Sequence, residues 1–484
     1  MTNTWSEFWW NHHICWNHDT LCITEETAFD AIVEGMRHTF EPVSLVVLSP
    51  AQIEQRIEQY TSQAGIGHEG LSQVIDESLE TVVRQVSDDI SIVSQADDGP
   101  IIKLLNNIFA EAIRLHASDI HIELQRPQSV VRFRIDGILT QIVTMSLAVA
   151  ERVVSRVKVL ARLNIAEKRI PQDGRMTVTL GSRTIDLRIS TIPSVDGERL
   201  VLRLLESKAN AKSIDAIGMS PAQQARLERL VLKPNGMILA TGPTGSGKTT
   251  TMYSALQRID ATTKNVMTVE DPVEYRLAGI SQTPINHQQN MTFATGLRAI
   301  LRQDPDVVLV GEIRDGETAQ IAAQASLTGH LVLSTLHANQ ASGCVTRLRD
   351  LGIESYIIAS AVRGLIAQRL LRRVCSHCVV HSPHTQAEDA TLRAMGAGQP
   401  PATLPRAVGC AHCNQTGYSG RYGVFEVIEM TEHVQNLIQN QADESVLQQA
   451  FADQAESLLE QGIEAVYRNI TTLEEVIRTL GDTQ

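Results

Sequence analysis

The sequence has few of the residues with which proteins hold nucleic acids. Its 42 lysines and arginines are outnumbered by 55 aspartates and glutamates, which gives a net charge of −13, and aromatic residues make up only 4%. Proteins that track a nucleic-acid strand use a positive surface for the phosphates and aromatic side chains on which the bases stack. We therefore expect no nucleic-acid partner.

The sequence also lacks a long apolar run. No stretch approaches the roughly 20 apolar residues that a membrane-spanning helix needs, and the tryptophan-rich start has no apolar core of the kind found in signal peptides. These absences predict a cytoplasmic protein whose contact with a membrane would come through a partner. At 484 residues the chain is too long for one hydrophobic core, so three or four domains are expected.

Cysteine is scarce, and its positions are informative. Four of the seven cysteines form two Cys-x-x-Cys pairs, Cys375/Cys378 and Cys410/Cys413. In a reducing compartment such pairs indicate metal ligands rather than disulfides. Four thiolates suit a tetrahedral Zn²⁺ ion and leave no open position, which favours a structural zinc site; a redox role is the alternative. Cys344 lies in a helix-like stretch and is expected to be a buried small hydrophobe.

One segment has the pattern of a loop that binds phosphate. Gly-Pro-Thr-Gly-Ser-Gly-Lys-Thr at 242–249 follows the apolar run 237–240 and precedes a helix-like stretch, as the G-x-x-x-x-G-K-[ST] motif requires. The glycines let backbone N–H groups curl around phosphate oxygens at the positive end of the helix. Lys248 is expected to reach the β- and γ-phosphates of ATP, and Thr249 to offer its hydroxyl to Mg²⁺. The predicted loop residues are Gly242, Pro243, Thr244, Gly245, Ser246, Gly247, Lys248, Thr249 and Thr250.

Strands and helices alternate from about Pro221 to Gln368, which predicts a parallel sheet with helices on both faces. In such a sheet the chemistry gathers at the carboxyl ends of the strands. Glu270 and Asp271 follow one apolar run, and we expect either of them to hold water or metal through hydrogen bonds. Two further apolar runs, 307–310 and 331–335, also lead into polar residues.

The carboxylate expected to act on water is Glu312. It follows the apolar run 307–310 and should emerge beside the γ-phosphate, where it can orient or deprotonate the attacking water. Gly311 stands where a second acid is usual, so Thr249 and bound waters are expected to carry most of the Mg²⁺ coordination. His337 and His330 flank a strand whose end should approach the γ-phosphate, and the case for them rests on position alone.

The preceding region, 98–206, has the pattern of an α+β domain. Asp98-Gly99-Pro100 opens a helix with one apolar stripe, and alternating strands follow, with the hairpin signal Asp136-Gly137 between two of them. The polar strand positions are rich in arginine and include Arg188 and Arg203. A solvated strand face is the usual explanation for such charges. Residues 207–220 are expected to form a flexible linker to the next domain.

All four tryptophans fall in the first sixteen residues. Trp5, Phe8, Trp9 and Trp16 share a helical face, which predicts part of the core of a small domain or, alternatively, an exposed anchor for a partner. An acidic stretch ending near residue 97 is expected to be a linker. The histidines and cysteines of the start fit no standard metal spacing: His12, His13, Cys15, His18 and Cys22.

Taken together, the motifs resemble the Walker A, Asp, Walker B and His boxes of secretion ATPases, in particular the assembly ATPases of type II secretion and type IV pili. The matching segments are 242–249, 268–275 (Thr-Val-Glu-Asp-Pro-Val-Glu-Tyr), 301–306 with 311–315, and 328–337 (Thr-Gly-His-Leu-Val-Leu-Ser-Thr-Leu-His). The likeness begins at about Pro100, where 117–123 and 165–175 also fit, and it runs to the C-terminus. The first 97 residues fit the family poorly.

The resemblance implies a fold and a division of the chain. The fold is a RecA-like P-loop domain with a parallel sheet, preceded by a PAS-like α+β domain and a small N-terminal domain, and followed by a zinc module and helices. The expected parts are a partner-docking domain with its linker at 1–97, the arginine-rich domain at 98–206, the linker at 207–220, the ATPase domain at 221–368, the four-cysteine module at 369–425, and a C-terminal helical region at 426–484, whose periodicity predicts short amphipathic helices.

The resemblance also implies an assembly. Six copies would form a ring, and each nucleotide would lie between the arginine-rich domain and the P-loop domain. The arginines that contact nucleotide or couple subunits in the family align with Arg188, Arg203, Arg298, Arg302 and Arg314. A guanidinium supplied across a mobile joint makes hydrolysis depend on domain closure. The N-terminal domain would dock onto the cytoplasmic domain of an inner-membrane platform protein, and a polytopic platform protein would be a second partner, so that the motor associates peripherally with the inner membrane.

We therefore expect a cytoplasmic hexameric ATPase that uses ATP, Mg²⁺ and Zn²⁺ and drives pseudopilus assembly in type II secretion. A type IV pilus assembly ATPase shares every motif, but the compact N-terminal region and the total length favour secretion. In the family the cysteine pairs accompany extension rather than retraction. A hexameric nucleic-acid motor is a more distant alternative, which the acidic balance opposes. A nucleotide-dependent scaffold without useful turnover is the remaining one.

Overall fold

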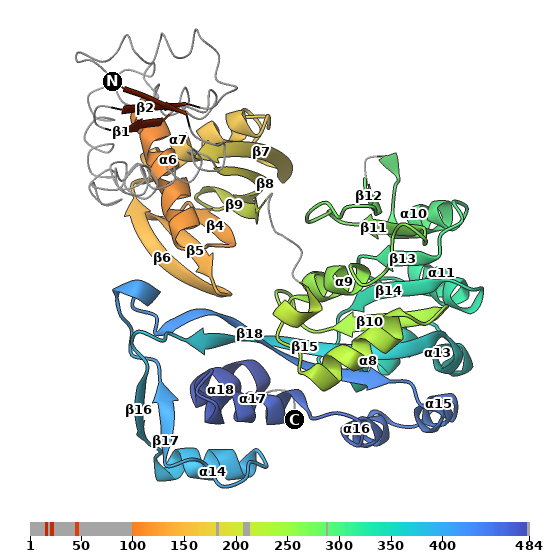
Figure 1. Ribbon diagram of the computed structural model, residues 1–484. Coiled ribbons are helices and arrows are strands. Elements are labelled where there is room, and N and C mark those ends of the chain that lie inside the picture. Colours follow the sequence, from red (N-terminus) through yellow and green to blue (C-terminus); the bar gives the residue numbers. More distant parts are fainter. Residues whose placement is uncertain are drawn as a thin grey trace. The chain divides into compact units, whose positions relative to one another are not determined.

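Figure 1 shows the computed structural model of the protein, which describes residues 15–17, 20–23, 44–47, 99–180, 183–206, 213–286 and 289–481. The chain divides into two units, Met1–Leu205 and Glu206–Gln484. Each unit has its own sheets and its own hydrophobic core.

Three short strands belong to the start of the chain: β1 (Cys15–Asn17), β2 (Thr20–Ile23) and β3 (Ser44–Val47). β1 and β2 pair antiparallel, with Trp16 opposite Leu21, and β2 and β3 pair parallel. The predicted helical face shared by Trp5, Phe8, Trp9 and Trp16 is therefore wrong at Trp16, because side chains in a strand alternate with a period of two. The other three aromatic residues and the acidic linker lie outside the described residues.

The rest of the first unit is a six-stranded antiparallel sheet with two helices, as the alternating pattern predicts. The strand order is β6-β5-β4-β9-β8-β7. The elements in chain order are α6 (Gly99–Arg114), β4 (Asp119–Glu123), β5 (Ser129–Ile135), β6 (Ile138–Met145), α7 (Leu147–Leu160), β7 (Gln172–Leu180), β8 (Arg183–Ser194) and β9 (Gly197–Glu206).

The core of this sheet-and-helix layer is built from the apolar stripe of α6 and the apolar strand positions. Leu104, Ile108 and Phe109 on α6 are at most 3% exposed, because their spacing places them on one helical face. Full burial of such a side chain contributes roughly 1.5–3 kcal/mol. Asp136 and Gly137 have positive φ angles of 46° and 86°, which is the turn that the Asp-Gly pair predicts between β5 and β6.

The second unit is organised around a seven-stranded sheet with the order β12-β11-β13-β14-β10-β15-β18. Its strands pair parallel except for β18, which is antiparallel to β15. The strands are β10 (Gly236–Thr241), β11 (Val266–Glu270), β12 (Ser281–Pro284), β13 (Val307–Val310), β14 (Leu331–Leu336), β15 (Val362–Val374) and β18 (Tyr418–Glu429). The expected parallel sheet is thus present, extended by one antiparallel strand.

Helices cover both faces of this sheet (Figure 1). One face carries α8 (Pro221–Val231) and α9 (Lys248–Leu256), and the other carries α10 (Phe293–Ile300), α11 (Gly316–Leu327), α12 (Ala341–Asp350) and α13 (Ser355–Ala361). Along β10, Ile238 and Ala240 pack with the first group, whereas Met237 and Leu239 pack with the second. Strands buried on both faces have to be apolar throughout, which explains the continuous apolar runs.

At two of the expected domain boundaries, the linker at 207–220 and the division at residue 368, the structure has regular secondary structure. From Ser213 onward the expected linker is packed: it forms a short 3₁₀ helix, Ile214–Ala216, and Ile214 and Met219 are buried in the core of the second unit. Ser220 then caps α8 through a capping box with Gln223. The expected division between the ATPase domain and the cysteine module at residue 368 falls inside β15.

The C-terminal part continues the second unit. β16 (Val380–Pro383) and β17 (Thr403–Arg406) pair antiparallel, and α14 (Gln386–Ala394) connects them. The predicted short amphipathic helices are α15 (Glu432–Gln439), α16 (Glu444–Ala452), α17 (Leu458–Tyr467) and α18 (Leu473–Leu480). Their apolar faces join the core that holds α10–α13. Within the described segments, no helix has the length and apolar character to cross a membrane.

Candidate active site and metal centre

The phosphate-binding motif has the strand–loop–helix context that the sequence predicts. β10 ends at Thr241 and α9 begins at Lys248. Gly242 and Gly247 have φ angles of 146° and 89°, a region that side chains with a Cβ rarely adopt. The loop therefore bends back over the end of its strand, and the backbone N–H groups at the start of α9 are left for a ligand.

Lys248 is held against the loop that precedes it. Its Nζ donates hydrogen bonds to the carbonyl oxygens of Gly242 at 2.7 Å and Pro243 at 3.1 Å. Burial lowers the pKa of Lys248, the charge of Glu312 raises it, and the charge of Arg369 lowers it further. The ammonium group is thus close to both of those side chains. Thr249 and Thr250 follow it, half-buried, on the first turn of α9.

Three of the predicted residues meet beyond the carboxyl ends of β13 and β14. Glu312 receives a hydrogen bond from Arg314, whose Nη2 lies 2.6 Å from Glu312 Oε1, and His337 Nε2 lies 3.5 Å from Glu312 Oε2. The hydrogen bond with Glu312 raises the pKa of Arg314, and the charge of Asp271 raises it further. Glu312, Arg314, Asp271 and Lys248 therefore form one cluster of charges, with His337 beside Glu312.

Glu270, at the end of β11, is 3% exposed and held by neutral donors. Its Oε1 accepts hydrogen bonds from Thr268 Oγ1 at 2.5 Å and from Gln282 Nε2 at 3.2 Å, and its Oε2 accepts one from the Tyr253 hydroxyl. Burial raises the pKa of Tyr253, and the charge of Glu270 raises it further, so this hydroxyl stays a donor. Because each carboxylate oxygen has two lone pairs, Oε2 keeps one position for a water molecule.

Three predicted site residues have their contacts outside this cluster. His330 precedes β14, and its Nδ1 lies 2.9 Å from the carbonyl oxygen of Ala325. His330 directly precedes β14 and His337 directly follows it. The six residues of the strand, at about 3.3 Å each, place the two histidines roughly 20 Å apart, at opposite ends of β14. Arg298 on α10 and Arg302 just after it are exposed. Arg298 pairs with Glu317 at 2.6 Å, and Arg302 donates to the carbonyl oxygen of Arg298 at 2.9 Å.

The two arginines predicted from the first unit lie on its sheet, whereas the phosphate loop lies in the second unit. Arg203 on β9 donates through Nε to Asp119 Oδ1 at 2.9 Å. Arg188 on β8 lies opposite Arg175 on β7. Both occupy polar positions of alternating strands, as the pattern predicts.

The four predicted cysteine ligands form one cluster, with all sulfur atoms within 4.8 Å of one another. Three Sγ–Sγ distances are 3.9, 3.7 and 3.8 Å. A tetrahedron with Zn–S bonds of about 2.3 Å has edges of about 3.8 Å, whereas a disulfide would need about 2.05 Å. Burial raises the pKa of the Cys413 thiol, but hydrogen bonds from the backbone N–H groups of Cys410 and Gly417 outweigh it and bring the pKa down to about 6. The cluster therefore fits a tetrahedral metal ion. Cys344 is fully buried in α12, as expected.

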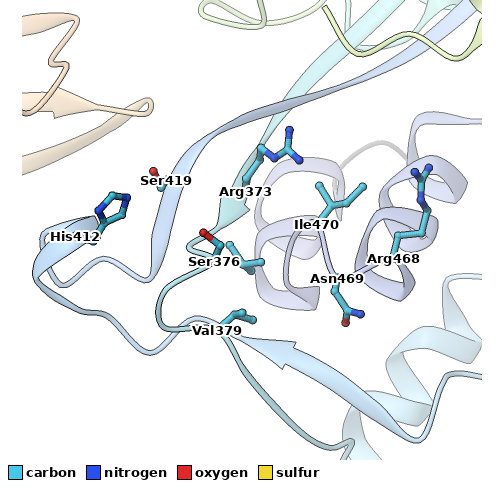
Figure 2. A pocket seen from close by; sticks show the side chains of 9 residues that line it. Arg373, Ser376, Val379, His412, Ser419, Arg468, Asn469 and Ile470 are labelled. Atoms are coloured by element: carbon cyan, nitrogen blue, oxygen red, sulfur yellow. The ribbon is translucent and has the colours of Figure 1, made fainter. Parts of the chain in front are cut away.

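A cavity of about 460 Å³ lies beside the cysteine cluster, at the C-terminal end of β15. Arg373, Ser376 and His412 line one part of it, and Arg468 and Ile470 after α17 line another. Figure 2 shows that Ile470 stands between the two arginine side chains and that the polar groups do not meet at one point. The cavity therefore belongs to the surroundings of the metal centre and not to the phosphate site.

Four further residues of the phosphate site have no signal in the sequence motifs. Tyr253 and Gln282 bind Glu270, as described, and Gln368 and Arg369 on β15 lie buried beneath the phosphate loop. The latter two could be noticed only as a polar pair inside the apolar run of residues 364–371.

Comparison with known proteins agrees with this architecture. Residues 94–478 match the protein family described as "Type II/IV secretion system protein". The chain is 47% identical over 462 residues to type II secretion system protein E of Pseudomonas aeruginosa, covering 95% of this chain and 91% of that protein. It is 43% identical over 470 residues to type II secretion system ATPase E of Vibrio cholerae, covering 96% and 93%. The solved structure of the pilus retraction motor PilT with bound ADP matches with a TM-score of 0.53 at 26% identity, covering 77% of this chain and 95% of that one. The chain therefore belongs to the type II/IV secretion system protein family, among the ATPases of type II secretion.

Proposed function

We propose that the protein is the motor ATPase that drives pseudopilus assembly and protein export in a type II secretion system. The observation that carries the proposal is the joint position of the phosphate loop, His337, Glu312 and Glu270. The first three follow β10, β14 and β13, and Glu270 is the last residue of β11. These four strands are consecutive neighbours in the sheet, in the order β11-β13-β14-β10. An ATP molecule bound at the loop would therefore have a base, a histidine and a second carboxylate near its γ-phosphate.

The proposed roles follow from the contacts. Lys248 exchanges its carbonyl partners for β- and γ-phosphate oxygens, while the loop residues 242–247 and the N–H groups of Thr249 and Thr250 cradle the phosphates. Thr249 would hold Mg²⁺ with bound waters, and the metal ion would neutralise charge on the phosphates. Glu312 orients the attacking water when Arg314 turns from the carboxylate toward the nucleotide. Glu270 Oε2 and Asp271 support that water or the metal-bound waters.

The larger assembly is also part of the proposal. A RecA-like second unit and a PAS-like arginine-rich domain would enclose the nucleotide between them, with Arg188 and Arg203 supplied from the latter. The exposed positions of Arg298 on α10 and of Arg302 after it suit contacts with a neighbouring subunit of a homo-hexamer. Zn²⁺ would be held by the four cysteines. The N-terminal domain would dock onto the cytoplasmic domain of an inner-membrane platform protein, beside a polytopic platform protein. The 43–47% identity to type II secretion proteins favours secretion over pilus assembly.

The test is ATP hydrolysis by the full chain carrying Glu312→Gln. Loss of the carboxylate should lower kcat by about 10²–10⁴-fold, the contribution of a general base, because the amide cannot accept the proton of the attacking water. ATP binding should remain, since the phosphate loop is intact, and secretion by a strain that carries only this variant should stop. Phosphate release and equilibrium ATP binding measure the two properties.

Lys248→Ala is the companion variant, and it should lose both binding and hydrolysis. Normal secretion with Glu312→Gln would favour a nucleotide-dependent scaffold instead. Stimulation of the wild-type hydrolysis by DNA would favour a nucleic-acid motor.

A further inference from the structure

Strand β15 carries two polar residues beneath the phosphate loop. Gln368 and Arg369 are 1% and 4% exposed, although the residues on either side, Ala367 and Leu370, are apolar. Polar groups that are buried so deeply are costly unless they are paired. The partners of these two side chains therefore show what the pair holds in place.

Gln368 binds the backbone of the phosphate loop. Its Nε2 donates a hydrogen bond to the carbonyl oxygen of Ser246 at 2.6 Å. The first glycine of the loop rests on the same strand: a Cβ at Gly242 would lie 2.5 Å from the carbonyl oxygen of Gln368 and 3.2 Å from Arg369 Nη1. Such distances leave no room for a side chain, so the loop packs directly against β15.

Arg369 holds a second loop, the one that follows His337. Its Nη2 donates to the carbonyl oxygen of Asn339 at 2.8 Å, and its Nη1 donates to the carbonyl oxygen of Gln368 at 3.1 Å. The neighbouring residue Ala338 is fixed by Thr241, whose Oγ1 donates to the Ala338 carbonyl at 2.7 Å and accepts from the Ala338 N–H at 2.9 Å. The loop after His337 is thus held by Thr241, which directly precedes the phosphate loop, and by Arg369 on β15.

The charge of Arg369 has no carboxylate partner in the described part of the chain, where its two acceptors are backbone carbonyl oxygens. Burial lowers the pKa of this guanidinium. An unneutralised buried cation is unfavourable, and it lies close enough to Lys248 to lower the pKa of that ammonium group. Two positive charges therefore lie close together at the phosphate loop. Two buried atoms there also have no hydrogen-bond partner among the described residues, Gln368 Oε1 and Ser246 Oγ.

We propose that Arg369 is a positioning residue for hydrolysis, which ties the loop carrying His337 to the phosphate loop and takes the bound phosphates as its counter-ion. The inference rests on the phosphate site described under the proposed function. Arg369 does not touch the reacting atoms. It acts through the backbone of Asn339 and Gln368, so that phosphate binding fixes His337 and, through the 3.5 Å contact, the orientation of Glu312.

The experiment compares Arg369→Met and Arg369→Lys in the full chain. For each variant, kcat and KM for ATP are measured, together with the rise in Tm caused by a saturating non-hydrolysable ATP analogue and Mg²⁺. Arg373→Met is the matched control, because Arg373 lies four residues further along the same strand and is exposed.

Arg369→Met should lower kcat by about 10²-fold, the effect of a small misplacement of catalytic groups. It should also reduce the nucleotide-induced rise in Tm, since the counter-charge is gone, while the Tm without nucleotide changes much less. Arg369→Lys should restore that rise but not kcat, because an ammonium group supplies the charge and cannot bridge two carbonyl oxygens as a guanidinium fork does. Arg373→Met should leave all of these values unchanged.

The proposal is overturned if Arg369→Met keeps its kcat, or if Arg369→Lys restores kcat together with the rise in Tm. It is also overturned if the Tm of Arg369→Met falls equally with and without nucleotide, which is the result expected of a purely structural residue. Should Arg369→Met be insoluble, Arg369→Lys decides alone by whether kcat falls while the rise in Tm is kept. A different failure is recognisable: if Lys248→Ala has the same rise in Tm as the wild type, the phosphate site itself is misassigned, and this inference falls with it.

Discussion

Single residues of this protein have properties that follow from burial rather than from residue type. Glu426 on β18 is an example. Burial raises the pKa of its carboxyl group to about 7, although the backbone N–H of Ala341, at the start of α12, opposes the change. In an unfolded chain the pKa of a glutamate is about 4.3. Between these two values the folded protein keeps a proton that the unfolded chain releases.

This difference predicts how stability depends on pH. Because the pKa is raised in the folded state, the contribution of Glu426 is fully present below about pH 4.3 and is lost as the pH rises to about 7. Glu426→Gln cannot ionise and keeps an acceptor for Ala341. Its free energy of unfolding should therefore gain up to about 3 kcal/mol on the wild type between pH 5 and pH 8. Urea unfolding at both pH values measures the gain.

Glu444→Gln is the control for this measurement, because Glu444 contacts the same helix through Ser342 and Thr346 but is exposed. It makes the same substitution outside the buried position of Glu426. An equal difference between Glu426→Gln and the wild type at pH 5 and pH 8 would contradict the explanation.

At the scale of elements, the motifs predict best where one local rule decides. The glycine pattern at 242–249 predicts a strand, a loop and a helix, and the apolar run 307–310 predicts the strand that presents Glu312; both are present. The rule fails at Trp16, where a helical period was assigned to a strand. For His330 and His337 the pattern indicated only that they flank a strand, and the six residues of β14 separate them. Contacts made through β15, such as that of Arg369 with Asn339, depend on which strands become neighbours in the sheet. A local sequence pattern does not predict this strand order.

The cysteine module gives the prediction at this scale. Cys410→Ser, or a zinc chelator, should remove the metal ion and lower the midpoint of thermal unfolding by more than about 5 °C, since structural zinc contributes directly to folding. The rise in Tm caused by nucleotide should persist, because Gln368 on β15 holds the phosphate loop and the cysteines do not. Metal analysis of the wild type should find one zinc ion per chain.

Cys344→Ser is a suitable comparison, because this fully buried cysteine lies outside the sulfur cluster. It should leave the zinc content unchanged. Unchanged thermal stability after removal of the metal ion would count against a structural site.

At the scale of the whole molecule, the sequence predicts the order of the folded regions, but it does not predict the structure of the segments that connect them. The antiparallel sheet of the first unit and the sheet of the second follow from periods of two and from alternating strands and helices. The packing of Ile214 and Met219 into the second unit is hidden in a stretch whose composition is that of a linker. The same holds for β15, which passes through the expected boundary at 368 because its apolar pattern continues to Val374.

A prediction at this scale concerns the arginines of the first unit. If Arg203 completes the nucleotide site from another domain, Arg203→Ala should lower kcat by about 10³-fold, while the Kd for ATP changes little. Phosphate release and equilibrium binding measure the two constants. Arg134→Ala is the matched control, since Arg134 approaches the same carboxylate of Asp119 at 3.8 Å. Equal losses of binding and hydrolysis in Arg203→Ala would exclude a role in the transition state.

The pairing of β15 with β18 has a consequence for the history and engineering of the chain. Val374 is the register partner of Tyr418, so residues 375–417 are, topologically, the tip of one long β-hairpin (Figure 1). Hairpin tips tolerate insertion and deletion because the ladder on either side stays intact, and each doubling of a loop costs only about 0.6 kcal/mol in closure entropy. The metal-binding segment is thus an insertion at the tip of this hairpin, and Leu392 and Leu404 anchor it in the core of the second unit.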